Sequence, residues 1–230
     1  MSVESGPKLR VAKSNRWSSV AGFLATLLVI GLISAIPFAF RAFLFQPFNA
    51  PSSSMAPTLV VGDYFFVSKY DYGFGLFPSE PRRGDVVVFR LPRDQSVQYV
   101  KRLVGMPGDR VQMIRGALYI NGQAVQREPL TPVAIEPGVT AKRWRETLAN
   151  GVSYETLDLY DAGLLDNTSV YEVPPGNYFM LGDNRDNSTD SRVPITRPGG
   201  IGYVPFENLT GRSRIIYFSA QGGRMGTLIH

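Results

Sequence analysis

The longest apolar run of the chain lies between residues 17 and 40, where twenty-four consecutive residues carry no charge. As a helix, this run would span about 36 Å, enough to cross a hydrocarbon core of about 30 Å. A cleaved secretory signal is the alternative, but its apolar region is typically only about 7 to 15 residues and ends at small residues. Here the run ends among phenylalanines and Arg41, and we therefore predict an uncleaved transmembrane helix with an aromatic interface.

Beyond this run, short apolar segments alternate with turn residues, which is typical of β-strands. The predicted strands are residues 64–70, 86–91, 97–105, 177–181 and 214–219. Asn121 and Gly122 stand between two apolar runs and are the strongest hairpin signal in the chain. The pattern weakens between residues 126 and 172, where residues 141–148 have a mildly helical composition.

The composition restricts the chemistry that the chain can perform. There is no cysteine, and the single histidine is the last residue, His230. Cysteine nucleophiles, Cys/His zinc sites and disulfides are thereby excluded, and a terminal histidine is a poor general base because chain ends are usually poorly held. Hydrolytic chemistry would have to use Ser, Lys, Asp, Glu or Tyr.

The net charge of +5 is concentrated at the N-terminus. Residues 1–16 contain four basic residues and one acidic residue, a balance of 4 − 1 = +3, which leaves 5 − 3 = +2 for the rest of the chain. This distribution argues against a groove that binds nucleic acid. It also predicts a cytoplasmic N-terminus with the body of the protein on the other side of the membrane, because basic residues flank the cytoplasmic end of a spanning helix.

A hydroxyl-rich segment, residues 51–59, follows the apolar run closely. Pro51 and Pro57 flank three consecutive serines, Ser52 to Ser54, and predict an exposed loop of restricted conformation. Segments of this composition are commonly linkers. The functional alternative is that one of the serines is a nucleophile near the membrane surface.

Lys101 lies within the predicted strand 97–105. Alternation with a period of two places it on the same face as Val97, Tyr99 and Leu103. A lysine in such a place often extends its ammonium group to solvent. The alternative is a desolvated amine with a lowered pKa, as a general base requires.

Residues 182–192 form a polar loop in which only Gly182 lacks a functional side chain. A calcium loop is one alternative, but Arg185 occupies a ligand position of the EF-hand pattern and no glutamate follows at the required spacing. We therefore predict no metal site. A serine loop, a lysine on an apolar strand face and a rigid polar loop together indicate a serine nucleophile activated by a neutral lysine.

Three segments carry a resemblance to a known family: residues 54–58, residues 83–89 with 99–109, and residues 182–192. Together they resemble the nucleophile box, the lysine box and the C-terminal box of bacterial type I signal peptidases, in the same order. Members of that family are membrane-anchored serine proteases with a Ser/Lys dyad that remove signal peptides from exported proteins. The resemblance covers residues 43–208 except for the middle segment.

The resemblance implies roles for individual residues. Ser54 would be the nucleophile and Lys101 the general base, while the hydroxyl of Ser52 and the backbone N–H of Ser54 would form the oxyanion hole. Ser188 would hydrogen-bond to the Lys101 amine and orient it. Four charged residues would support the site through ion pairs: Asp183, Asp190, Arg102 and Arg192. Four residues would line pockets for the alanines at positions −1 and −3 of a signal peptide: Met55, Leu59, Tyr99 and Val100.

The resemblance also implies a fold and a location. The expected fold is mostly β, with an antiparallel β-sheet catalytic core that is interrupted by an inserted β subdomain and preceded by one N-terminal transmembrane helix. The expected divisions are a basic segment (1–16), an anchor (17–40), the core (41–111 and 175–230) and the insert (112–174). The expected location is the bacterial inner membrane, in single-pass orientation with the catalytic body on the extracytoplasmic side. The expected partners are signal peptides and membrane lipid, without nucleic acid, metal or cofactor.

Some relatives have two transmembrane segments, whereas this sequence shows one. Two other interpretations remain. SOS-type repressors cleave themselves with related chemistry, but they are soluble and carry a DNA-binding domain, for which residues 1–40 leave no room. A membrane-tethered, non-catalytic β binding module or an inactive relative is the other alternative, and it would need to have lost the nucleophile or the base.

Overall fold

The computed structural model describes residues 16–43, 45–72 and 79–230. The chain divides into two compact units, Met1–Arg41 and Ala42–His230. Nearly all of α1 (Arg16–Phe43) belongs to the first unit, and the helix covers the one predicted at residues 17–40. Within α1, the hydroxyls of Thr26 and Ser34 donate hydrogen bonds to backbone carbonyls four residues earlier, so these polar groups are satisfied inside the helix. No helix among the described residues reaches the combination of length and apolar character required of a membrane span.

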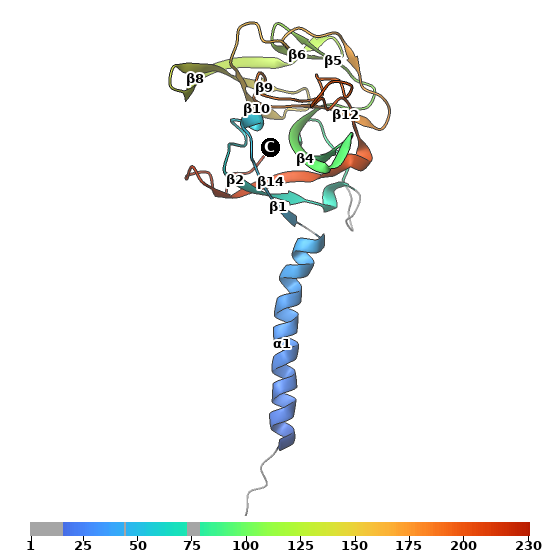
Figure 1. Cartoon of the computed structure of the whole chain (residues 1–230), viewed down its shortest axis with the longest axis vertical. Coiled ribbons are helices and arrows are strands. Elements are labelled where there is room, and N and C mark those ends of the chain that lie inside the picture. Colours follow the sequence, from blue (N-terminus) through green and yellow to red (C-terminus); the bar gives the residue numbers. More distant parts are fainter. Residues whose placement is uncertain (1–15, 44, 73–78) are drawn as a thin grey trace, which may run out of the picture. The chain divides into compact units, whose positions relative to one another are not determined.

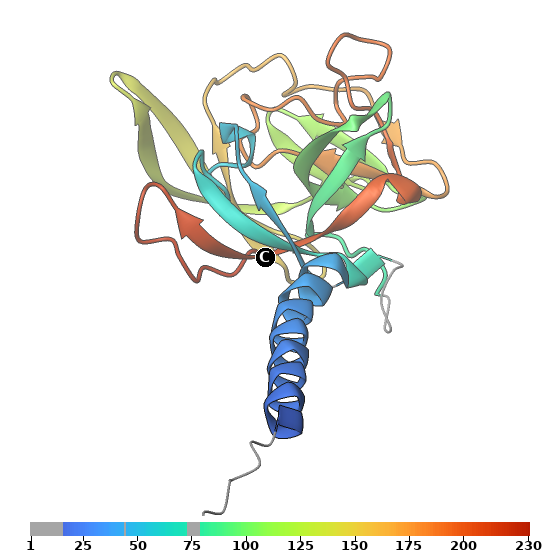
Figure 2. The same ribbon diagram turned by 60° about the horizontal axis from the view of Figure 1, so that its bottom comes forward.

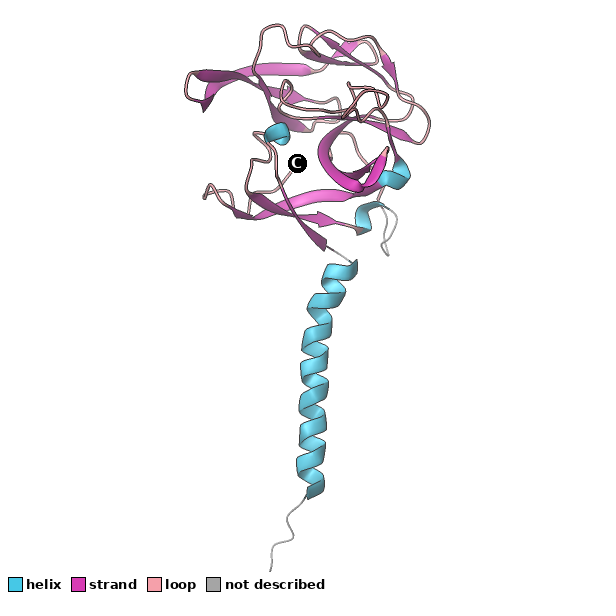
Figure 3. Cartoon of the chain, in the orientation of Figure 1, coloured by secondary structure: helices cyan, strands magenta, loops and turns pink. Residues whose placement is uncertain are grey.

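The second unit is built from antiparallel β-sheets, as the strand colouring of Figure 3 shows, and this confirms the prediction of a mostly β fold. The largest sheet has seven strands. In spatial order they are β1 (Phe45–Asn49), β2 (Asp63–Ser68), β14 (Leu209–Ser219), β3 (Val86–Leu91), β4 (Asp94–Gly105), β12 (Asn177–Leu181) and β13 (Val204–Pro205). Figures 1 and 2 show the orange-red β14 running beside the cyan β2, far from it in sequence.

Two smaller sheets are formed by the chain between β4 and β12. One contains β11 (Tyr171–Glu172), β5 (Arg110–Ile114), β6 (Ala117–Ile120) and β7 (Gln123–Ala124). The other contains β10 (Ser153–Asp158), β9 (Val139–Thr147) and β8 (Gln126–Glu136). Three short 3₁₀ helices complete the described elements: η1 (Ser53–Met55), η2 (Tyr70–Tyr72) and η3 (Phe206–Asn208). Residues 42–230 form one compact unit, and the division into a core and an insert 112–174 stays a prediction.

Several strands lie where the sequence predicts them. β3 and β12 coincide with the predicted residues 86–91 and 177–181. The predicted hairpin is formed by β6 and β7. Its turn residues, Asn121 and Gly122, both have positive φ angles, 54° and 80°, the conformation that favours Asn-Gly in a two-residue turn.

Residues 141–148, which have a mildly helical composition, lie almost entirely in strand β9. β9 is the middle strand of its sheet and pairs with both β8 and β10. Pairing on both sides satisfies the backbone N–H and C=O groups of the segment, and tertiary pairing of this kind overrides a weak helical propensity.

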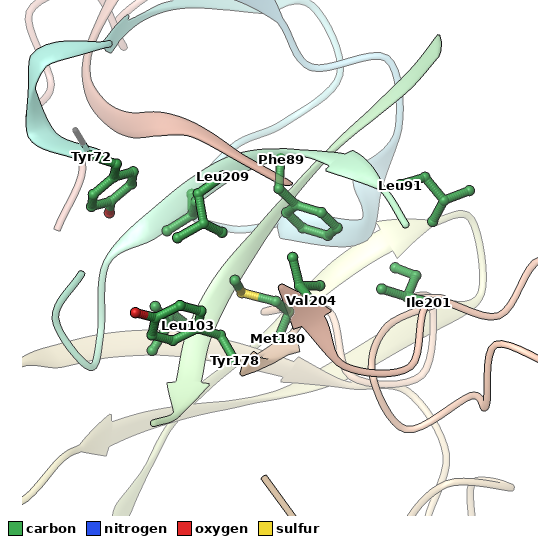
Figure 4. Close-up of a cluster of buried hydrophobic side chains, with 10 residues drawn as sticks. Tyr72, Phe89, Leu91, Leu103, Tyr178, Met180, Ile201, Val204 and Leu209 are labelled. Atoms are coloured by element: carbon green, nitrogen blue, oxygen red, sulfur yellow. The ribbon is translucent and has the colours of Figure 1, made fainter. Parts of the chain in front are cut away.

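The core lies on both sides of β3. Val87, Phe89 and Leu91 belong to one buried cluster, shown in Figure 4, and Val86 and Val88 belong to another. Successive side chains of a strand point to opposite faces, so a continuous apolar run is what a strand covered on both faces requires. Full burial of each such side chain stabilises the fold by about 1.5–3 kcal/mol.

Strand pairing brings the charged residues of β4 next to the polar loop. β4 lies between β3 and β12. Arg102 of β4 pairs with Val86 on one side and with Leu181 on the other. Leu181 ends β12 and is followed by the loop 182–192. The strand that carries Lys101 therefore lies next to the strand that leads into the polar loop.

Candidate active site

The serine loop connects β1 to β2 and is anchored to the core. Ser52 has an extended backbone and Ser53–Met55 form the 3₁₀ turn η1. Met55 is buried in one of the core clusters, while Ser54 is only 8% exposed. The peptide bond Ala56–Pro57 is cis. A buried anchor immediately after Ser54 gives this serine a defined position, which a flexible linker would not.

Lys101 meets Ser54 although 47 residues separate them in sequence. Its Nζ donates a hydrogen bond to Ser54 Oγ at 2.6 Å, and its side chain is 1% exposed. Burial lowers the pKa of Lys101 to about 8, although the charges of Asp190 and Asp183 oppose this shift. The ammonium would also lie 5.6 Å from the centre of the Tyr99 ring. A buried amine of this pKa can be neutral at mildly alkaline pH.

Two more of the predicted serines lie at the site. Ser52 Oγ donates a hydrogen bond to Ser54 Oγ at 3.2 Å. Ser188 lines the same cleft as Lys101, but its buried hydroxyl has no hydrogen-bond partner. The bond from Ser188 to the Lys101 amine is therefore not formed in this structure, and the orienting role of Ser188 stays a prediction.

The four predicted support residues form two buried ion pairs. Arg102 donates to Asp183 through two nitrogens, at 2.8 and 2.7 Å, and Arg192 donates to Asp190 at 2.8 Å through each of two nitrogens. Burial raises the pKa of Asp190, but the charge and hydrogen bonds of Arg192 outweigh it and hold that pKa below its usual range. The Asp190 carboxylate therefore remains charged at neutral pH beside Lys101.

A cleft of about 370 Å³ lies over the serine and lysine. Its lining residues are Ser52, Ser53, Ser54, Tyr99, Lys101, Asp186, Asn187, Ser188 and Thr189. Of the four predicted pocket walls, only Tyr99 belongs to this lining. Met55 and Leu59 are buried in the core, and Val100 packs partly buried against the same cluster. Their contact with substrate stays a prediction.

The sequence interpretation missed several residues at the site. Asp186, Asn187 and Thr189 fall within the polar loop and line the cleft, so the loop motif itself was the available signal. Thr58 was also missed, and its hydroxyl donates to Asp183 at 2.6 Å. The main-chain oxygen of His230 accepts a hydrogen bond from Arg102 at 2.6 Å, so this residue is held in place, contrary to our general expectation for a chain end.

The donors for a metal site are also limited. Among the residues that the structure describes, no group of three or more His, Cys, Asp or Glu side chains could hold a metal ion. Two buried carboxylates of the site, those of Asp183 and Asp190, are paired with arginines. The side chains that line the cleft are hydroxyls, the Lys101 amine, the Asn187 amide and the single carboxylate of Asp186.

An antiparallel β body that holds a serine hydroxyl against a buried lysine amine defines a candidate serine hydrolase. Comparison with known families makes the class specific: the profile described as "Signal peptidase, peptidase S26" matches residues 22–218. The chain therefore belongs to the signal peptidase family, and its class is that of a serine endopeptidase.

Curated relatives agree with this assignment. A protein named signal peptidase I from Rickettsia conorii is 39% identical over 227 residues, which cover 89% of this chain and 79% of the relative. A signal peptidase I from Rickettsia akari is 36% identical, with coverage of 92% and 82%. A solved signal peptidase I from Enterococcus faecalis is 27% identical and covers 58% of this chain and 97% of its own, with a TM-score of 0.35, too low for a comparison of site geometry.

Proposed function

We propose that this chain removes signal peptides from exported preproteins, with Ser54 as the nucleophile and neutral Lys101 as its general base. The observation that carries the proposal is the 2.6 Å contact between Lys101 Nζ and Ser54 Oγ in a site where the lysine is buried. Membership of the signal peptidase family supports the substrate class.

Acylation follows from this geometry. Neutral Lys101 accepts the proton of Ser54 as Ser54 Oγ attacks the scissile carbonyl carbon, and the resulting ammonium then donates a proton to the departing amine. The negative charge that develops on the carbonyl oxygen needs donors already in place. Ser52 Oγ lies 3.2 Å from Ser54 Oγ, so its hydroxyl and the Ser54 N–H are suitable donors.

Deacylation uses the same groups. A water molecule attacks the acyl-enzyme carbonyl, Lys101 accepts its proton, and Ser54 leaves as a hydroxyl after protonation by the lysine. Ser188 lines the same cleft as Lys101, and we retain its proposed role of orienting the amine. Asp183 and Asp190 stay paired with Arg102 and Arg192 and keep the surrounding charge fixed.

We also propose that the substrate has small residues at positions −1 and −3. Tyr99 is part of the wall of the cleft beside Ser54. We retain Met55, Leu59 and Val100 as the proposed floor of the pockets, which would be reached from this cleft when a peptide binds. Alanine fits such a pocket, and a larger side chain would displace the carbonyl from Ser54.

The location proposed for the enzyme is the bacterial inner membrane. The charge-free run of residues 17–40 supports a single transmembrane anchor, and the basic residues before it support a cytoplasmic N-terminus. The catalytic body would then face the extracytoplasmic side, where exported preproteins emerge. Within the body we retain residues 41–111 and 175–230 as the catalytic core, with residues 112–174 as an insert.

The test is cleavage of a preprotein by the full-length chain in detergent. The expected result is a new N-terminus immediately after a small residue of the signal peptide, read by N-terminal sequencing. Ser54→Ala should abolish the cleavage with an almost unchanged melting temperature, because one hydroxyl contributes little packing. Cleavage by this variant at the wild-type rate would refute the nucleophile, and equal loss in Ser53→Ala would point to the conformation of the loop instead.

A further inference from the structure

Glu146 is a buried acid in a sheet that contributes no residue to the lining of the catalytic cleft. It lies on β9, is 1% exposed, and receives hydrogen bonds from two nitrogens of Arg185, at 2.8 and 2.6 Å. The hydroxyl of Tyr154, on β10, donates to the same carboxylate at 2.9 Å. A charge so deeply buried is costly unless it is paired and hydrogen-bonded, and Glu146 meets both conditions.

Arg185 carries this contact into the catalytic loop. Its Nε donates to the carbonyl oxygen of Gly182 at 3.2 Å, and its own carbonyl oxygen accepts a hydrogen bond from Arg192 at 2.6 Å. The guanidinium group of Arg185 is thus bonded both to the Glu146 carboxylate and to the loop backbone at Gly182. The ion pair joins the three-stranded sheet to the segment that follows β12.

Gly182 lies directly between the nucleophile and Ser188. A Cβ atom at this position would lie 2.2 Å from Ser188 Oγ and 2.6 Å from the carbonyl oxygen of Ser54. Only glycine fits so close an approach. The peptide that Arg185 holds therefore determines the spacing between the serine loop and Ser188.

The same sheet contacts the site along a second path. The guanidinium of Arg102 lies 3.9 Å from the centre of the Tyr154 ring, in the range of a cation–π interaction. Leu157 of β10 donates its N–H to the Asp183 carbonyl and accepts from the Arg185 N–H, each at 2.8 Å. The backbone N–H of Asn184, between those two residues, donates to the Ser54 carbonyl at 3.1 Å.

We propose that Glu146 is a positioning residue for the cleavage reaction: through Arg185 it holds the Gly182 peptide, and so fixes the loop 182–192 against Ser54. This inference rests on the proposed function. The sheet of β8, β9 and β10 would then contribute to catalysis although it does not contact the substrate. Loss of Glu146 should therefore slow the chemical step and leave substrate binding nearly unchanged.

The experiment compares variants of the full-length chain in detergent by steady-state cleavage of one preprotein. In Glu146→Gln, an NH₂ group replaces an acceptor oxygen that faces donors of Arg185 or Tyr154, and the Arg185 charge loses its partner. We expect kcat to fall at least tenfold and KM to change less than twofold. The matched control is Glu155→Gln on β10, whose partners Arg143 and Arg145 are half-exposed and which should keep wild-type kcat and KM.

A double variant separates positioning from stability. Glu146→Met with Arg185→Met removes both buried charges, and such replacement is often neutral or stabilising. We expect its melting temperature to return to near the wild-type value while kcat stays at least tenfold low, because Gly182 has lost its donor. Since neither charge of the Glu146–Arg185 pair remains in this variant, it can test the proposal even if Glu146→Gln does not fold.

The outcomes distinguish this inference from the proposed function. Wild-type kcat in folded Glu146→Gln, or recovery of kcat together with the melting temperature in the double variant, would show that the pair only stabilises the fold and would overturn the inference. A fall in kcat/KM caused by KM alone would overturn it too. A wild-type chain that cleaves no preprotein would instead overturn the proposed function, and this inference with it.

Discussion

Replacement of Lys101 by arginine distinguishes a general base from a structural cation. Burial lowers the pKa of Lys101 from 10.5 to about 8. At pH 7 a lysine with that pKa is neutral in roughly one molecule in ten, against about one in three thousand for an ordinary lysine, a gain of about 300-fold in the reactive form. Arginine stays protonated at any usable pH. Because a general base contributes about 10²–10⁴-fold, Lys101→Arg should lower kcat/KM by a factor in that range.

The assay is the pH dependence of kcat/KM for a signal-peptide substrate, measured from about pH 6 to about pH 10 with the full-length enzyme in detergent. A base acts only when it is unprotonated, so kcat/KM should rise about tenfold per pH unit below the lysine pKa and level off above about pH 8. Lys101→Met is the matched variant, with neither charge nor base, and thermal melts establish that both variants are folded. An active arginine variant beside an inactive methionine variant would show that Lys101 only supplies charge. A flat wild-type profile would refute the reasoning as well.

Two further predictions concern the substrate pocket and the membrane. Replacement of Ala at position −1 of a substrate by Phe or Leu should block cleavage, because a displacement of about 1 Å can cost on the order of a hundredfold in rate; efficient cleavage after these residues would contradict the pocket. Deletion of residues 1–40 should leave a folded body that binds lipid vesicles through the apolar segment around Phe45 and Phe48, with loss of binding expected in the double variant Phe45→Ser, Phe48→Ser. If the truncated protein is active but does not bind vesicles, the apolar segment is buried against the body of the protein. Phe45 and Phe48 do pack against aromatic rings of β2.

Local sequence patterns were sufficient for much of the fold. The apolar run 86–91 and the segment 177–181 became β3 and β12 with unchanged ends, because strand pattern and turn residues are properties of neighbouring positions. Asn121 and Gly122 formed the expected turn for the same reason. The candidate nucleophile, base and polar loop could also be located, since each lies in a short segment of distinctive composition.

Pairing between distant segments decided the rest. Residues 141–148 have a composition that permits a helix, but β8 and β10 on either side make this segment a central strand. Met55 and Leu59, which are proposed to form the floor of the pockets, are buried in the core, where the available space depends on Val86, Ile216 and other residues far along the chain. Glu146 gave no signal, because its partner Arg185 lies 39 residues away.

Lys101 shows most clearly what a local sequence pattern can indicate and what depends on contacts between distant segments. Alternation along β4 placed the lysine among apolar neighbours, which suggested a lowered pKa. Its 2.6 Å contact with Ser54 and its nearly complete burial depend on the serine loop, β3 and the loop 182–192 meeting around one amine. Desolvation is the sum of contacts made by all the segments that exclude water, so a pattern along one strand can indicate a base but cannot create one.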